Sequence, residues 1–349
     1  MLSINEAARR LKQGEIVAIP TETVYGLAAD ASKLLAIQQI FVLKQRPSDN
    51  PLIVHIGSLD QLDEFSKQLT DIELRIVNKF WPGPLTLVLP KKQGVLDAIT
   101  AGLDTVAVRM PNHSQCLKLL QKTGPLVAPS ANLSGTPSPT KAKHVLSDFG
   151  ENFLVVDGGD CTIGLESTVL TCRQNYPFTT GQESSPASRT VQPDMLIYRP
   201  GAISAKELSE FGSVEYFTPS QSKRDHPSTL TGVPSPGLKY RHYAPKAAVQ
   251  WLSDVEQLGS LNKPSIIFLL DKTHPYTQSF VDNAGKDGHS ILCCEGGWER
   301  FGQLLYDTFR MADAENYPHI FIQDIRQHVP ASSLKDALIN RIEKAISGH

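Results

Sequence analysis

The run from Lys44 to Ile56 constrains the fold more than any other part of this sequence. It begins with two cations, Lys44 and Arg46, and passes through a polar turn into an apolar strand that contains His55. Pro47 cannot continue a helix, so the chain must turn directly after the cations. Cations beside a rigid polar turn could bind phosphate or carboxylate oxygens, or they could only complement the negative end of a helix dipole. The run by itself leaves both interpretations open.

Length and composition favour a two-domain globular protein. The chain has 349 residues, of which 40% are hydrophobic and 20% charged, and a formal net charge of −2. That charge argues against a protein that coats nucleic acid by bulk positive charge, although a local basic groove remains possible. Charged residues interrupt the first eleven positions, so we expect no signal peptide, and no apolar run approaches membrane-spanning length.

Cysteine usage indicates a reduced compartment. The five cysteines are odd in number and show no Cys-x-x-Cys spacing. They are Cys116, Cys161, Cys172, Cys293 and Cys294. This pattern favours a cytoplasmic protein over a disulfide framework or a zinc site, and we expect no protein-held metal.

Several predicted strands of the first two hundred residues end in polar side chains. The strand over 15–20 opens into Thr21, Glu22 and Thr23, and the strand over 52–56 contains His55. Open α/β sheets bind ligands at the carboxyl ends of such strands. A hydroxyl-capped turn after the first strand and a core histidine in the second are the simpler alternatives.

Arg109 lies in an apolar strand predicted over 106–110. An arginine among valines is costly to bury without an anionic partner, which could be an internal carboxylate or a ligand. The strand that starts at Leu126 ends in small donors, among them Ser130 and Asn132, and Ser138 follows. Small residues let backbone N–H groups approach a phosphate, but Ser138 could equally be the N-cap of the next helix.

Hydrophobic periodicity predicts further elements along the chain. Helices are expected over 32–45, 59–69, 72–80, 113–121 and 205–211, and strands over 85–89, 153–157, 164–170 and 195–200. The polar segment from Arg173 to Pro193 is predicted to be a surface loop. A second series of strands and helices runs from Ala248 to Ile346 and predicts a small α/β unit without catalytic motifs.

The segment between these units is unusual for a linker. It is polar over 218–233 and then aromatic and basic from Ser235 to Pro245. Tyrosine and arginine side chains could stack on a base, which predicts a lid over the site, although a stiff hinge packed by its own tyrosines is the alternative.

The polar residues together predict an anion-binding cleft. The sequence has no Walker phosphate loop, His-Glu-x-x-His motif or Gly-x-Ser-x-Gly elbow. The predicted strand ends instead offer hydroxyls, amides and cations with few acidic bases. Fixed cations with backbone donors suit charge stabilisation in phosphoryl or nucleotidyl transfer.

Ordered motifs across the whole chain resemble a known family. The motifs are Pro20-Thr21-Glu22-Thr23-Val24-Tyr25-Gly26-Leu27, Lys44-Gln45-Arg46-Pro47, Asn50-Pro51-Leu52, Trp81-Pro82-Gly83-Pro84-Leu85-Thr86 and Pro129-Ser130-Ala131-Asn132. They resemble the YrdC-like domain. The run from Ser235 to Pro245 and the C-terminal unit resemble the longer, two-domain threonylcarbamoyl-AMP synthases. Leu238 stands where that family often has methionine.

The resemblance implies a fold and a domain organisation. We expect an α/β protein with an N-terminal twisted, open, mixed YrdC-like sheet and a smaller C-terminal Rossmann-like α/β domain. The expected boundaries are 1–203 for the catalytic domain, 204–246 for the linker with its lid and 247–349 for the C-terminal domain.

The resemblance also implies a reaction. L-threonine, bicarbonate and ATP would give L-threonylcarbamoyladenylate and pyrophosphate, for the threonylcarbamoyl modification of the tRNA adenosine next to the anticodon. Mg²⁺ would be carried with ATP rather than held by the protein. The implied partners are the downstream tRNA threonylcarbamoyl-transfer machinery, with weak RNA binding and no membrane. An RNA-binding module and a carbamoyl-transfer maturation factor are the alternative functions.

Residue roles follow from the resemblance, position by position. Lys44 and Arg46 would stabilise the transition state. The residues implied for L-threonine are Thr23, His55, Arg109, Ala128 and Ser167, with Arg109 paired to the carboxylate. The residues implied for ATP are Arg46, Asn50, Thr105, Ser130, Asn132, Ser138, Arg199 and Tyr240, and Tyr240 would close over the nucleotide with Arg241 and His242 nearby.

Overall fold

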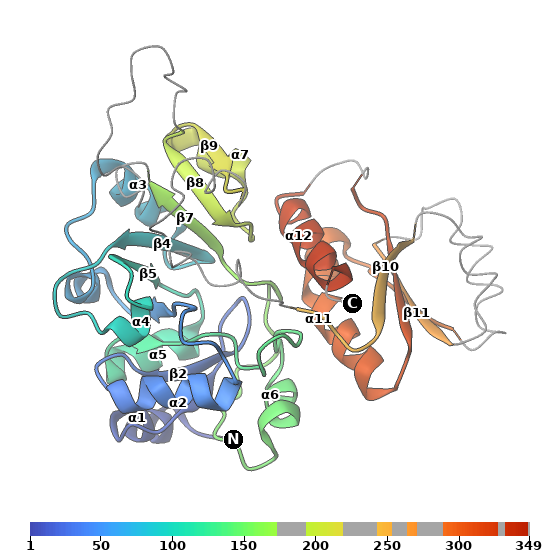
Figure 1. Ribbon diagram of the computed structural model, residues 1–349, viewed down its shortest axis with the longest axis horizontal. Coiled ribbons are helices and arrows are strands. Elements are labelled where there is room, and N and C mark those ends of the chain that lie inside the picture. The colour runs from blue at the N-terminus through green and yellow to red at the C-terminus, as the bar shows by residue number, and fades with distance from the viewer. Residues whose placement is uncertain (173–192, 219–242, 253–263, 271–288, 327–331, 348–349) are drawn as a thin grey trace.

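The chain forms two sheets that belong to two domains (Figure 1). The computed structural model describes residues 1–172, 193–218, 243–252, 264–270, 289–326 and 332–347. The predicted loop over 173–193, except for Pro193, and the linker over 219–242, with Tyr240, lie outside these ranges. The α/β class and the two-domain arrangement predicted from the sequence are confirmed.

The N-terminal domain is built on a nine-stranded mixed sheet in the order β1-β2-β6-β3-β5-β4-β7-β8-β9. Three neighbouring pairs are parallel, namely β3 with β5, β4 with β7 and β8 with β9. The strands are β1 (Val17–Ile19), β2 (Gly26–Asp30), β3 (Ile53–His55), β4 (Leu85–Pro90), β5 (Thr105–Arg109), β6 (Leu126–Val127), β7 (Thr168–Cys172), β8 (Met195–Arg199) and β9 (Val214–Tyr216).

Helices cover the sheet through apolar residues. The helices are α1 (Ile4–Lys12), α2 (Leu34–Lys44), η1 (Leu59–Glu64), α3 (Asp71–Phe80), α4 (Asp97–Thr100), α5 (Ser114–Thr123), α6 (Ala142–Phe149), α7 (Ala205–Leu208) and η3 (Ser209–Phe211). Helix α2 is apolar on its exposed side as well, with Leu35 and Val42 each 76% exposed. Helices α1 and α5 share one apolar cluster with alternate residues of β1, whereas α2 and α3 pack into the main cluster. This alternation follows from the two-residue period of a strand.

The end of α2 places Arg46. Gln45 adopts a left-handed conformation with a φ of 52°, which ends the helix before Pro47. Lys44 is the last residue of the helix, and its side chain is buried. Arg46 lies beyond the end of the helix, in the turn that follows. The turn that Pro47 imposes was predicted from the sequence.

The C-terminal domain is a four-stranded parallel sheet in the order β10-β13-β11-β12. Its elements are β10 (Ala248–Leu252), β11 (Ser265–Leu269), β12 (Ser290–Cys293), α11 (Gly297–Ala314), β13 (His319–Gln323) and α12 (Lys335–Ile346). The central strands β11 and β13 and the helices α11 and α12 bury apolar residues, whereas the residues of the edge strand β12 are only partly buried. Figure 1 shows α11 and α12 on the side of this sheet that faces the N-terminal domain.

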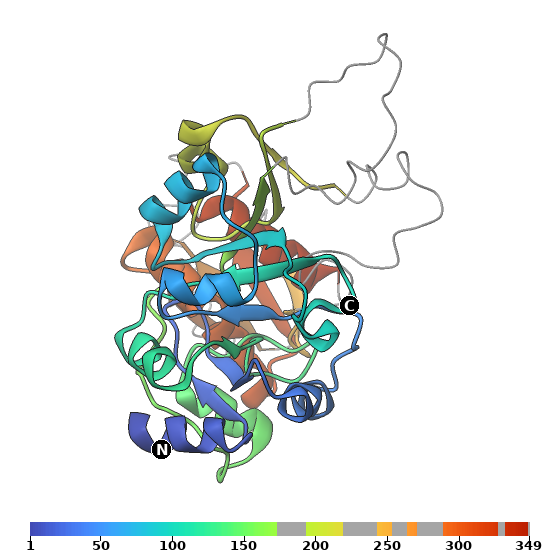
Figure 2. The same cartoon turned by 90° about the vertical axis from the view of Figure 1, so that its left-hand side faces the viewer.

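The two domains share an apolar and polar contact surface. Val24 and Leu165 of the N-terminal domain pack in the same cluster as Tyr243, Tyr306 and the core of the C-terminal domain. Figure 2 views the molecule from the N-terminal domain, with the C-terminal domain behind it. Because helices α11 and α12 lie at this surface, their side chains can reach the N-terminal site.

Three predicted elements differ from the structure. The helix predicted over 59–69 is only the 3₁₀ helix η1. The carbonyl of Phe65 accepts a hydrogen bond from the backbone N–H of Lys92 instead of one from a further helical turn, and the hydroxyl of Ser66 donates to the carbonyl of Pro90. The strand predicted over 153–157 makes a single parallel bridge, between Val155 and Ala18.

The third is the strand predicted over 164–170, which begins only at Thr168.

Strands β2 and β9 and the short helix α4 were not predicted. Sheet pairing extends to Tyr216, and the domain boundary at residue 203 stays a prediction. Within the described residues, no helix is both long and apolar enough to cross a membrane.

Candidate active site

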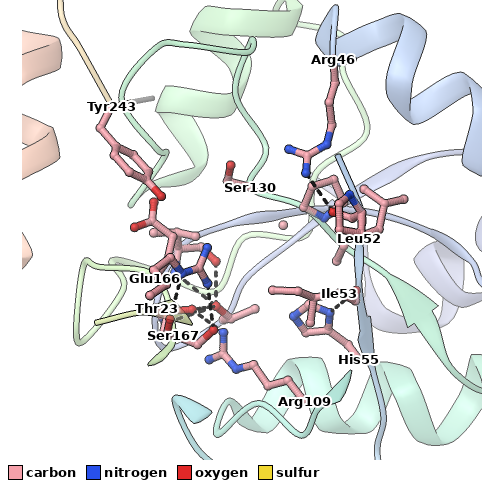
Figure 3. A pocket seen from close by; sticks show the side chains of 17 residues that line it. Thr23, Arg46, Leu52, Ile53, His55, Arg109, Ser130, Glu166, Ser167 and Tyr243 are labelled. Atoms are coloured by element: carbon pink, nitrogen blue, oxygen red, sulfur yellow. Dashed lines mark hydrogen bonds between the residues drawn. The ribbon is translucent and has the colours of Figure 1, made fainter. Parts of the chain in front are cut away.

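A pocket opens on the N-terminal sheet where it meets the C-terminal domain (Figure 3). Among the described residues, its lining combines apolar groups with hydroxyls, cations and one carboxylate, that of Glu166. The lining residues are Thr21, Thr23, Val24, Gly26, Arg46, Pro51, Leu52, Ile53, His55, Arg109, Ala128, Pro129, Ser130, Glu166, Ser167, Arg199 and Tyr243.

Strand register aligns the polar residues in one row. His55 at the end of β3 pairs with Arg109 at the end of the parallel strand β5. Arg109 pairs in turn with Thr86 of β4, and Thr86 pairs with Val169 of β7. Val169 then pairs with Arg199 of β8. The row therefore crosses five neighbouring strands at one level of the sheet. Carboxyl ends of parallel strands are where such sheets bind ligands.

A buried ion pair forms the floor of the pocket. Arg109 lies 2.7 Å from Glu22, and their side chains are 4% and 6% exposed. Arg109 also donates to the hydroxyl of Thr23 at 2.8 Å and to the carbonyl of Gly83 at 3.2 Å. Glu22 is thus the internal carboxylate that the sequence left open as a partner. It fixes the guanidinium at the pocket without consuming all of its donors.

Serine and threonine hydroxyls continue this network. Ser167 contacts the hydroxyl of Thr86 at 2.7 Å and accepts hydrogen bonds from Arg199, at its carbonyl (3.0 Å) and at its hydroxyl (3.1 Å). Thr21 contacts Thr23 at 2.8 Å. Burial lowers the pKa of Arg199, but a guanidinium remains charged at neutral pH.

His55 is a neutral group in this site. Burial, together with the charge of Arg109, lowers its pKa to about 3. Its Nδ1 lies 3.2 Å from the carbonyl of Ile53, which places the ring proton on Nδ1. His55 can therefore accept a hydrogen bond from a ligand at Nε2, but it supplies no positive charge.

The two cations of the opening run play different parts. Arg46 lines the pocket, and its guanidinium is tied to the loop carbonyls of Asn50 (3.3 Å) and Pro51 (2.9 Å). Burial lowers its pKa to about 10, so it stays charged at neutral pH. Lys44 does not line the pocket, since its ammonium donates to the carbonyls of Ser130 and Asn132, both at 2.5 Å.

Lys44 holds the loop behind the site. Its side chain is 1% exposed, and burial with the nearby charge of Arg46 lowers its pKa well below the usual value. By bonding the carbonyls of Ser130 and Asn132 it fixes the loop that carries the Ser130 hydroxyl into the pocket.

The wall nearest the C-terminal domain contains Glu166 and Tyr243. Tyr243 comes from the end of the linker and has a φ of 71°, a left-handed conformation. Figure 3 shows its ring above the carboxylate of Glu166. Neither residue was predicted as a site residue, although Glu166 precedes Ser167 and Tyr243 belongs to the aromatic linker motif.

All five residues implied for L-threonine line one pocket, and so do Arg46, Ser130 and Arg199 from the set implied for ATP. The other described members of the ATP set do not line it. Ser138 donates to Glu166, Asn132 bonds its own loop, Asn50 is buried behind Arg46, and Thr105 lies at the far end of β5. The roles of all these residues stay predictions.

No metal-binding cluster of three or more His, Cys, Asp or Glu side chains occurs in the described residues. The five cysteines, all within the described ranges, are free thiols. The carboxylate in the pocket, Glu166, is already occupied by donors.

Known proteins share both domains of this chain. A family described as telomere recombination matches residues 9–179, and the C-terminal domain of threonylcarbamoyl-AMP synthase matches residues 203–347. The threonylcarbamoyl-AMP synthase of Bacillus subtilis is 36% identical over 99% of this chain and 93% of its own length. That of Pyrococcus abyssi is 44% identical over 98% of this chain and 93% of its own length.

The chain belongs to the threonylcarbamoyl-AMP synthase family.

A solved structure agrees with this assignment. The crystal structure of P. abyssi Sua5 complexed with L-threonine has a TM-score of 0.79 and 33% identity, over 99% of this chain and 94% of that one. The resemblance read from the sequence motifs, the enzyme class and the synthase function of the family are thereby confirmed. The threonylcarbamoyl-AMP synthase fold thus places its row of polar residues at the junction of the two domains.

Proposed function

We propose that this chain makes L-threonylcarbamoyladenylate from L-threonine, bicarbonate and ATP, with release of pyrophosphate. In this reaction the amine of threonine is carboxylated to a carbamate, and a carbamate oxygen attacks the α-phosphate of ATP. Both reactants are anions, so the site must offset their repulsion and hold them in line. A pocket with fixed cations and hydroxyl donors meets both needs.

L-threonine is proposed to bind over the floor of the pocket. Arg109, held by Glu22, faces the pocket with a charge that suits the amino-acid carboxylate. Thr23 and Ser167 offer hydroxyls beside it, and the neutral imidazole of His55 can accept a hydrogen bond. The L-threonine-bound relative from P. abyssi supports this choice of ligand.

ATP is proposed to lie along the side of the pocket formed by Arg46, Ser130 and Arg199. The two guanidinium groups would offset phosphate charge, and rigid hydrogen bonds to loop carbonyls hold each in place before the ligand arrives. Preorganised cations stabilise developing charge without reorganisation during the reaction.

Mg²⁺ is proposed to arrive with the ATP phosphates. Glu166 already accepts hydrogen bonds from Tyr306 and Arg341, so the pocket offers no spare carboxylate among the described lining residues. A hydrated ion held by phosphate oxygens fits such a donor set better than a protein cage.

The product would pass to the tRNA threonylcarbamoyl-transfer machinery. We place the reaction in the cytoplasm because the five thiols are free.

The observation that carries the proposal is the single pocket that joins the predicted threonine set to Arg46, Ser130 and Arg199. Incubation of the protein with ATP, bicarbonate and labelled threonine, followed by mass spectrometry, should detect the adenylate. Absence of the adenylate, with ATP unconsumed, would refute the proposal.

The two cations near α2 provide a sharper test. We expect Arg46→Ala and Lys44→Ala each to abolish threonine-dependent pyrophosphate release, by about a hundredfold or more. The reasons differ. Arg46→Ala removes a charge from the pocket and two hydrogen bonds to loop carbonyls, so it should lower the melting temperature less than the change at the fully buried Lys44 does. Lys44→Ala releases the loop at Ser130 and should also lower the melting temperature. Normal turnover in both variants would contradict the assignment.

A further inference from the structure

The pocket contains a carboxylate where an anionic ligand is expected. Glu166 is 6% exposed and lies in the pocket wall with Arg199 and Tyr243. An unpaired carboxylate here would oppose the phosphates that Arg46 and Arg199 are proposed to attract. Whether the pocket can bind a polyphosphate therefore depends on whether the charge of Glu166 is neutralised by a partner.

Helices of the C-terminal domain supply most of that bonding. Arg341 of α12 donates from Nε to Glu166 at 2.8 Å, and the hydroxyl of Tyr306 of α11 donates to the same oxygen at 3.1 Å. Ser138 donates to the other oxygen. Among the described residues, Ser138 is the one donor to this carboxylate that belongs to the N-terminal domain.

Arg341 is fixed for this role. Its side chain is 0% exposed, and it also donates to the carbonyl of Pro200 at 3.1 Å. Its guanidinium lies 5.0 Å from the centre of the Tyr243 ring, which stacks on Tyr306 at 5.7 Å. A long side chain with so many contacts is immobilised beside the pocket wall, and it reaches Glu166 only while the two domains are docked.

The ion pair between Glu166 and Arg341 changes the net charge that the pocket presents to ATP. Within the part of the chain that the structure describes, Glu22 pairs with Arg109, which leaves Arg46 and Arg199 as the lining cations that can face phosphate. With Arg341 in place, Glu166 is neutralised by a charge from the other domain. Without it, Glu166 would offset one of those two cations, and the pocket would bind ATP less well.

We infer that Arg341 of the C-terminal domain is a positioning residue for the nucleotide pocket, because it neutralises Glu166 and thereby keeps the pocket wall selective for a polyphosphate anion. This inference rests on the proposed use of the pocket for ATP. It gives the C-terminal domain a specific part in ATP binding, carried by one ion pair across the domain interface.

The test compares variants of the full chain by equilibrium binding of ATP, with pyrophosphate release as a second readout. Arg341→Met removes the charge, and we expect the Kd and KM for ATP to rise about tenfold, while kcat stays within about threefold. The double variant Arg341→Met/Glu166→Gln removes both charges and should bring the Kd back to within about threefold of the wild type.

A matched control separates charge compensation from domain docking. Lys141 of the N-terminal domain makes another ion pair across the same interface, at 2.8 Å from Asp307 of α11, and neither residue lines the pocket. Lys141→Met should lower the melting temperature and leave the Kd for ATP unchanged. If Lys141→Met raises the Kd as much as Arg341→Met does, or if the double variant does not recover, the inference is overturned.

A gentler pair of variants covers the case in which Arg341→Met does not fold. Tyr306→Phe deletes only the hydroxyl that bonds Glu166, and we expect the Kd for ATP to rise about fivefold. Tyr317→Phe deletes a hydroxyl that contacts Ser290 within the C-terminal domain and should leave that Kd unchanged. Equal values in the two variants would overturn the inference.

The binding readout keeps the two proposals apart. A wild-type protein that binds ATP but forms no adenylate would refute the proposed function, while the variant series would still decide the role of Arg341. A wild-type protein that forms the adenylate but shows no recovery in the double variant would refute the role of Arg341 alone.

Discussion

Two buried ion pairs border the pocket, and they differ in which part of the chain supplies the arginine. On the floor, Arg109 and Glu22 both belong to the N-terminal domain and lie 2.7 Å apart. At the wall, Glu166 belongs to the N-terminal domain, and Arg341, 2.8 Å away, comes from the last helix of the C-terminal domain.

The two pairs also point opposite charges at the ligand. Arg109 faces the pocket and Glu22 lies behind it, whereas Glu166 faces the pocket and Arg341 lies behind it. The floor pair therefore presents a cation to the ligand, and the wall pair hides an anion from it. A buried pair is weak support for stability by itself, but removal of one partner leaves an uncompensated charge. The comparison teaches that one kind of contact can attract a substrate in one place and prevent repulsion in another.

The largest expected effect comes from breaking the floor pair. Arg109→Met should lower kcat/KM for threonine by about a hundredfold to a thousandfold, because it removes the cation proposed to hold the carboxylate. It should also lower the free energy of unfolding by about 3–5 kcal/mol, since Glu22 is left buried and unpaired. Pyrophosphate release and denaturant titration measure the two effects.

The double variant Arg109→Met/Glu22→Gln distinguishes the two pairs. It should regain much of the stability but none of the activity, because the cation that faces the ligand is still missing. Recovery of activity here, as expected for the wall pair, would show that the two pairs act alike and would remove the distinction.

A smaller effect is expected from the backbone beneath the wall. A Cβ at Gly201 would lie 2.2 Å from the backbone nitrogen of Thr168 and 2.8 Å from the carbonyl oxygen of Glu166. Gly201→Ala must therefore move the turn that carries Glu166 and Ser167. We expect it to cost about 1–3 kcal/mol of unfolding free energy and to weaken ATP binding.

Gly102→Ala is the control for this variant. A Cβ at Gly102 would meet nothing within 4 Å, although its φ of 78° is a left-handed conformation. We expect it to lose about 1 kcal/mol and to leave ATP binding unchanged. Equal ATP affinities in the two variants would argue against the close packing of the wall turn.

The smallest effect concerns the pH dependence of the floor. Burial lowers the pKa of His55 from 6.5 to about 3, so the unfolded chain binds this proton and the folded chain does not. The free energy of unfolding therefore decreases as the pH falls below 6.5, the pKa of this histidine in the unfolded chain. Between about pH 7.5 and about pH 5.5 the loss is about 1.4 kcal/mol.

Denaturant titrations of the wild type and of His55→Gln at the two pH values measure this difference. The wild type should lose about 1.4 kcal/mol more than the variant on acidification. The same loss in both proteins would show that His55 is not the buried neutral group described above.

The amino-acid sequence by itself determined much of this protein. The turn at Pro47, the helices with one apolar face and the buried strands follow from local chain chemistry, which periodicity and proline restrictions report directly. The ordered motifs determined the family, and they led to Thr23, His55, Arg109 and Arg46, which one pocket brings together.

Only the tertiary structure decided what each polar residue touches. Strand order and register put His55, Arg109, Thr86 and Arg199 in one row, and no local pattern encodes the pairing of strands distant in the sequence. The same holds for Lys44, which looked like a pocket cation but bonds the carbonyls of Ser130 and Asn132.

The pairing of Glu166 with Arg341 also required the folded molecule. The two residues lie in different domains, and an ion pair leaves no spacing signal in a sequence because any two segments that fold side by side can form it. The sequence thus determined which side chains are available for chemistry. Tertiary packing decided which of them face the ligand and which are neutralised, because charge compensation depends on distances of a few ångströms across the folded chain.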